Sequence, residues 1–186
     1  MKSIRVYSCA FVALCSSALA LAATVKYSAL EDFEHAFEGK LAQNPGPGKY
    51  LPFDVLFSAP AAYVPGVGLT LTSWVNLVYT PPLAISPFSP PLNDQQKEDL
   101  RAHKLERIPI LEQNMREVMA DAAASPSFDA IPAGEHISLG VSLFYFPWEH
   151  QEGLPRQITM SAQKQQLLQA RRDKIDLAKV IQEQKL

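Results

Sequence analysis

Cysteine is nearly absent from this sequence. The chain of 186 residues contains two cysteines, Cys9 and Cys15, and both lie in its apolar N-terminal stretch. The rest of the chain therefore has no disulfide, no cysteine nucleophile and no thiolate metal ligand. The chain is 47% hydrophobic, and it is long enough to bury a core without disulfide support.

An excess of positive charge is also missing. The formal net charge is −2 at pH 7. Loss of residues 1–22 would remove Lys2 and Arg5 but no acidic residue, which leaves 15 basic and 19 acidic side chains and a charge of −4. Because a mildly acidic chain has no bulk electrostatic reason to bind nucleic acid, we expect no nucleic-acid partner.

The signatures of familiar catalytic and cofactor sites are missing as well. No two histidines have the HExxH spacing of a zinc protease, and no G-x-S-x-G marks a serine nucleophile. The glycine-rich segment 63–68 lacks the lysine and the following helix of a phosphate loop. We therefore expect no metal and no cofactor.

The N-terminal stretch shows the order of features that is typical of a secretory signal peptide. Lys2 and Arg5 give a positive start, residues 6–20 are almost wholly apolar or small, and two small-x-small sites end at Ala20 and Ala22. This order predicts a signal peptide over residues 1–22, cleaved near Ala22, and a periplasmic or secreted protein. Its only membrane contact would precede cleavage, since the apolar run is shorter than the roughly 20 residues of a transmembrane helix.

Hydrophobic spacing predicts a helix and two strands in the N-terminal half. Apolar residues from Leu30 to Leu41 recur every three or four positions, which predicts a helix over about 29–42 with Ser28 as its N-cap. Period-two alternation predicts strands within 50–58 and 63–79. Five prolines in residues 80–93 predict a stiff loop that can serve as a rim for a partner.

The C-terminal half predicts a long helix, two strands and a last helix. Asn93 and Gln96 form a capping-box pattern, and Pro109 is expected to kink the helix that follows or to split it near Ile108. Residues 136–146 predict a central strand that is covered on both faces, and residues 157–160 a short one. Ser161 would cap a charged C-terminal helix over 161–184 that projects into solvent.

This order of elements has no regular strand–helix alternation and no internal repeat. It favours a single α+β domain over residues 23–186, with a mostly antiparallel sheet and helices packed on one face.

The turn after the predicted central strand is the most promising binding site. Trp148, Glu149 and His150 follow one another there, and exposed aromatic residues on stiff loops are natural anchors for partners. An alternative is a hydrolase that uses Glu149, His150 or Ser142, which requires these groups to converge on a cleft. A third hypothesis makes the charged C-terminal helix a coiled-coil arm, although its apolar positions are too few for a sustained heptad pattern.

Part of the chain resembles a family of exported bacterial proteins of uncharacterised function. The resemblance is carried by Leu143-Phe144-Tyr145, Trp148-Glu149, Gly153-Leu154-Pro155 and Gln157-Ile158, with Tyr63-Val64-Pro65-Gly66 and Met115-Arg116-Glu117 fitting the same pattern. It covers about residues 60–168 and implies export and a single domain, but no activity. The leading hypothesis is therefore a non-enzymatic exported domain that binds a protein, an envelope component or a small ligand.

Overall fold

The computed structural model describes residues 24–43, 52–78 and 92–186. The predicted signal peptide and nearly all of the proline-rich loop lie outside these ranges. The described residues form a mixed sheet with helices on one side, so the predicted α+β class is confirmed. None of the described helices is both long enough and apolar enough to cross a membrane.

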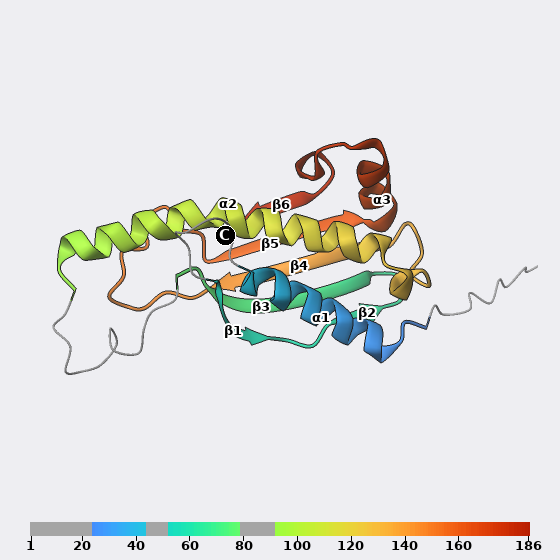
Figure 1. The fold of residues 1–186 in the computed structure, drawn as a ribbon, viewed down its shortest axis with the longest axis horizontal. Coiled ribbons are helices and arrows are strands. Elements are labelled where there is room, and N and C mark those ends of the chain that lie inside the picture. The colour runs from blue at the N-terminus through green and yellow to red at the C-terminus, as the bar shows by residue number, and fades with distance from the viewer. Residues whose placement is uncertain (1–23, 44–51, 79–91) are drawn as a thin grey trace, which may run out of the picture.

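Six strands form the sheet (Figure 1). They are β1 (Asp54–Ser58), β2 (Ala62–Val64), β3 (Gly68–Asn76), β4 (His136–Leu143), β5 (Gln157–Gln163) and β6 (Gln182–Lys185). The order across the sheet is β1-β3-β4-β5-β6, and β2 pairs with β3. All pairs are antiparallel except β3 and β4, which are parallel. Parallel neighbours need a long crossover, and the chain between β3 and β4 contains the longest helix.

Two helices cover the same face of the sheet (Figure 1). Helix α1 (Tyr27–Ala42) and helix α2 (Asp94–Ala124) bury their apolar sides against alternate residues of the strands. Leu111, Met115 and Met119 of α2 are fully buried, as are Ile137 of β4 and Ile158 of β5. The core is thus one layer between the helices and one sheet face.

Helix α2 is continuous from Asp94 to Ala124 with Pro109 inside it, so the predicted split is wrong. Pro109 lies on the exposed side of the helix. Water can satisfy the carbonyl that the proline leaves unpaired there, while buried Ile108 and Leu111 hold both halves against the core. The predicted capping box is confirmed, because Asn93 accepts a hydrogen bond from the Gln96 amide and Gln96 accepts one from the Asn93 amide.

The helix cap predicted at Ser28 is wrong. Helix α1 begins at Tyr27, two residues earlier than predicted, and Lys26 at its N-cap makes no side-chain capping bond. The strand predicted over 63–79 is a hairpin of β2 and β3, in which Gly66 has a φ of 81° at the turn. Gly68 has a φ of 128°, and a Cβ there would lie 1.9 Å from the carbonyl oxygen of His136. Gly66 therefore allows the tight turn between β2 and β3, and Gly68 allows the close pairing of β3 with β4.

The C-terminal segment is not the single helix predicted over 161–184. Ser161 lies within β5, helix α3 spans only Lys164–Asp173, and Lys174 ends it in the left-handed conformation with a φ of 53°. The chain then returns through the 3-10 turn η3 (Leu177–Lys179) and pairs with β5 as β6. Sequence patterns missed β6 because its four residues are all polar and exposed. The hypothesis of a coiled-coil arm is therefore not supported, because the C-terminal segment packs on the domain.

Ion pairs join strand β6 to helix α2. Arg116 of α2 lies 2.5 Å from a carboxylate oxygen of Glu183, and Lys185 lies 2.5 Å from Glu112. Glu112 also lies 3.4 Å from Arg116. These contacts replace the apolar packing that the inner strands use.

Removal of the α2 cap should destabilise the fold. Asn93→Ala leaves amide groups at the helix start without a partner, so we expect a loss of about 1 kcal/mol in the free energy of unfolding. Ser28→Ala is the matched control, because Ser28 is exposed and does not occupy the α1 cap position; its effect should stay within about 0.5 kcal/mol. Urea denaturation measures both changes. Equal losses in the two variants would contradict the assigned caps.

The contact between α1 and α2 should depend on pH. Lys40 lies 2.5 Å from Glu117. Hydrogen bonds from Lys40 and Gln113 hold the pKa of Glu117 below its usual value of 4.5. As the pH falls below 4.5, the unfolded chain takes up this proton first. The stabilisation is therefore complete above that pH and is lost as the pH falls further.

Glu117→Gln should remove this stabilisation. The pair is partly exposed, so its contribution should be less than about 1 kcal/mol. The difference in the free energy of unfolding between the native protein and the variant should shrink as the pH falls below 4.5. A difference that stays constant over the whole acidic range would show that the pair contributes nothing.

Candidate functional site

The second face of the sheet is not covered by any element of the described part of the chain. Residues of this face alternate with the core residues along each strand, so the register of the strands fixes which side chains are neighbours on it. We call this surface the open face. It contradicts the prediction that strand 136–146 is covered on both sides, because all described helices that pack on the sheet lie on the other side (Figure 1).

Strand register arranges the open face in rows. One row holds Thr70, Ser138, Ser161 and Gln182, the next holds Thr72, Gly140, Thr159 and Gln184, and the third holds Phe57, Trp74, Ser142 and Gln157. Neighbouring strands lie about 4.8 Å apart, and rows on one face are about 6.8 Å apart. The face is therefore a regular lattice of hydroxyl and amide groups with two aromatic side chains at one end.

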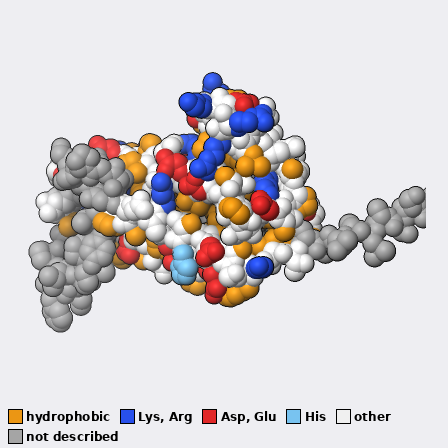
Figure 2. Space-filling view, turned by 45° about the vertical axis from the view of Figure 1, so that its right-hand side comes forward, with side chains coloured by type: hydrophobic (Ala, Val, Ile, Leu, Met, Phe, Trp, Pro, Cys, Tyr) orange, Lys and Arg blue, Asp and Glu red, His pale blue; other side chains and the backbone are white. Residues whose placement is uncertain are grey.

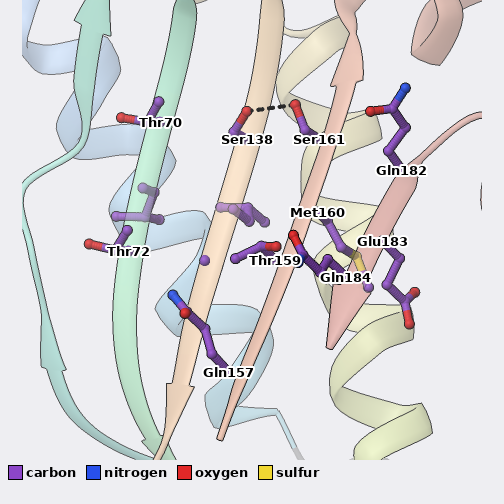
Figure 3. A pocket seen from close by; sticks show the side chains of 13 residues that line it. Thr70, Thr72, Ser138, Gln157, Thr159, Met160, Ser161, Gln182, Glu183 and Gln184 are labelled. Atoms are coloured by element: carbon purple, nitrogen blue, oxygen red, sulfur yellow. Dashed lines mark hydrogen bonds between the residues drawn. The ribbon is translucent and has the colours of Figure 1, made fainter. Parts of the chain in front are cut away.

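A shallow groove of about 660 Å³ crosses this lattice over β3, β4, β5 and β6 (Figure 3). The Ser138 and Ser161 hydroxyls are hydrogen-bonded at 2.8 Å. Gly140 forms part of the groove floor, where a Cβ would lie 3.3 Å from the Thr72 methyl group and 3.9 Å from that of Thr159. The absence of a side chain at Gly140 thus keeps the centre of the groove low.

Charged side chains are rare along the open face. Glu183 is the one charged residue that lines the 660 Å³ groove, and its carboxylate is paired with Arg116 of α2, on the helical side. Figure 2, in contrast, shows Lys, Arg, Asp and Glu side chains interspersed over the helical side of the molecule. The open face therefore offers hydrogen bonds without a net electrostatic attraction.

The aromatic end of the open face is unusually exposed. Trp74 is 56% exposed and Phe57, its neighbour across the β1–β3 pair, is 59% exposed. Two hollows flank Trp74. One of them is lined by Leu56, Phe57, Thr72 and Ser142. The other is lined in part by Phe144, Gln151 and Arg156. Alternation in residues 63–79 predicted a strand but not this site, because the packing of the sheet decides which alternate residues stay exposed.

The predicted binding turn lies next to this aromatic end. The Trp148 ring is half-buried and stacks on Phe146 at 5.2 Å, with the ring planes 8° apart. Phe146 in turn meets the edge of Phe144 at 4.9 Å, and Phe144 lines a hollow beside Trp74. His150 is exposed, with Nδ1 3.7 Å from a carboxylate oxygen of Glu98 on α2. Binding by Trp148, Glu149 and His150 stays a prediction.

Glu149 is not in an exposed acidic turn. Its side chain is 2% exposed and its carboxylate lies 2.5 Å from the ammonium group of Lys104, which is fully buried in α2. Burial lowers the pKa of Lys104, and Glu149 partly offsets this effect. The Tyr145 ring lies 4.9 Å from the ammonium group, and its hydroxyl donates to the Pro155 carbonyl at 2.7 Å. Burial and the nearby Glu149 charge raise the pKa of Tyr145.

The structure does not bring the proposed hydrolase residues together. Ser142 faces the hollows beside Trp74, whereas Glu149 and His150 contact α2 on the helical side. A nucleophile and its base must lie within hydrogen-bond reach of each other, so Ser142 cannot form a catalytic pair with Glu149 or His150 in this arrangement. Within the described ranges, no three His, Cys, Asp or Glu side chains are grouped so that they could hold a metal ion.

The chain matches no protein-family model, no curated protein and no solved structure.

The Lys104–Glu149 pair should be essential to the fold. Glu149→Ala leaves the ammonium group of Lys104 buried without its partner, which should reduce the free energy of unfolding by about 3–5 kcal/mol. The double variant Lys104→Met, Glu149→Leu should recover most of that loss, since apolar residues of similar size often replace buried pairs well.

The partly exposed pair of Arg101 and Glu98 provides the control. The Arg101 and Glu98 side chains are 24% and 46% exposed, so Glu98→Ala should destabilise the fold far less than Glu149→Ala does, because solvent screens this pair. Urea denaturation of the three variants tests the comparison. A small loss in Glu149→Ala, or no recovery in the double variant, would contradict the structural role of the buried pair.

Proposed function

We propose that this protein is an exported binding domain that holds an uncharged ligand of the cell envelope on its open face. The order of charged, apolar and small residues in 1–22 supports export and removal of that segment near Ala22. The observation that supports binding most directly is a sheet face that no described element covers, lined by hydroxyl and amide groups and ending in exposed Trp74 and Phe57.

The open face exposes more apolar surface than a sheet face in contact with water needs. Polar side chains alone would suffice to keep one face of an antiparallel sheet in water. Leu56, Phe57 and Trp74 are instead 43%, 59% and 56% exposed and lie together. A contiguous exposed apolar patch with a polar rim is typical of an interaction site.

The chemistry of the groove favours a neutral ligand. Ser and Thr hydroxyls and Gln amides can both donate and accept hydrogen bonds. Binding of nucleic acid or of an anionic lipid surface depends on clustered Lys and Arg, and the 660 Å³ groove has none. The envelope is the compartment that an exported protein meets first, so its neutral components are the natural ligands of this proposal.

A charge placed in the groove should abolish binding. Thr72 is exposed on the open face beside Gly140. Thr72→Lys brings an ammonium group into the groove, and we expect binding of residues 23–186 to isolated envelope to weaken about tenfold or more. Ala102→Lys, on the exposed side of α2, is the matched control and should bind as the native protein does.

Sedimentation of the protein with an envelope preparation measures this binding, and circular dichroism shows that both variants are folded. Native-like binding by Thr72→Lys would refute the proposal. Equal losses in the two variants would also refute it, because the effect would then follow total charge and not the open face.

A further inference from the structure

We infer that the ligand of the open face is a neutral polysaccharide, with sugar rings packed on Trp74 and sugar hydroxyls bonded to the rows of the groove. This inference rests on the proposed function and names the class of ligand. It follows from the shape of the face, from its hydrogen-bonding groups and from the position of Trp74.

The hollows of the open face form a continuous path. The groove over β3–β6 shares Thr72 with the hollow beside Phe57, and that hollow shares Trp74 and Ser142 with the one beside Phe144. Their volumes are about 660, 530 and 440 Å³, and none of them is a closed cavity. A small molecule needs a concave site that buries most of its surface, whereas a path of shallow hollows fits an extended chain.

Trp74 stands between two of these hollows. The residue is 56% exposed, although burial of a tryptophan side chain is strongly favourable. The C–H groups on one side of a pyranose ring form a small apolar surface that can pack against an indole face. A sugar in this position would cover Trp74 while its hydroxyls remained free to bind Ser142 or Thr72.

The hydrogen-bonding groups match a polysaccharide better than they match a protein surface. Sugar hydroxyls both donate and accept, as do the Ser, Thr and Gln side chains of the rows. Protein–protein interfaces are depleted in Ser relative to the rest of the surface, whereas the open face carries Ser138, Ser142 and Ser161. Arg156 is exposed at the rim of one hollow, and it is the one cation that lines these three hollows.

Affinity electrophoresis in gels that contain a polysaccharide tests the inference. The probes are neutral glucan, mannan and xylan, with polygalacturonic acid as an anionic counterpart. We expect residues 23–186 to be retarded by at least one neutral probe. Trp74→Leu keeps an apolar side chain but removes the ring, and should weaken this interaction about tenfold.

Three further variants test the aromatic contact, the specificity of the effect and the groove floor. Trp74→Phe restores an aromatic ring and should recover a large part of the retardation. Tyr27→Ala removes a ring that is 68% exposed at the start of α1, away from the open face, and should change nothing. Gly140→Val raises the groove floor against the Thr72 methyl group and should weaken binding while the protein stays folded.

The outcomes distinguish this inference from the proposed function. Binding to envelope that is lost in Thr72→Lys, but that resists glycan-degrading enzymes and is abolished by protease, would identify a protein partner and overturn the polysaccharide. Retardation by polygalacturonic acid alone would overturn the neutral class. Envelope binding that Thr72→Lys leaves intact would refute the proposed function itself.

Discussion

One-sided packing of helices on the sheet is the constraint on which the rest of this structure depends. Leu111, Met115 and Met119 of α2 share one core with the apolar residues of β3, β4 and β5, and each fully buried side chain of this size contributes about 1.5–3 kcal/mol. Because strand residues alternate between faces, this packing commits every second residue of the sheet to the opposite side. The rows of the open face are a geometric consequence of how the core is built.

The polar contacts of the domain support that single layer. The fully buried Lys104–Glu149 pair and the exposed contacts of Arg101 join the loop between β4 and β5 to the N-terminal part of α2. At the β6 edge of the sheet, the pairs Arg116–Glu183 and Lys185–Glu112 join β6 to the same helix. Both sets of contacts lie on the helical side, so the open face can differ in composition without loss of stability. Exposure of Trp74 is therefore not a requirement of the core.

Elements with strong periodicity were predictable from the sequence. Helix α1, helix α2 with its Asn93 cap and strand β4 follow from apolar spacing, because burial on one face imposes that spacing. Strand β6 was not predictable, since its four polar residues pair with β5 through backbone groups and with α2 through ion pairs. Burial of Glu149 was hidden for a similar reason: its partner Lys104 is 45 residues away in the chain. The open face could not be predicted, because it depends on the order of the strands in the sheet, and no local sequence pattern contains that order.

Binding at the open face requires that Trp74 be exposed in the folded protein, and fluorescence measures this exposure. The sequence has two tryptophans, Trp74 and Trp148, so Trp148→Phe leaves Trp74 as the sole reporter. We expect the emission of an indole in water and strong quenching by acrylamide in the native state. A blue-shifted emission with weak quenching would show that another part of the protein covers Trp74, and would rule out ligand binding by the open face of the free protein.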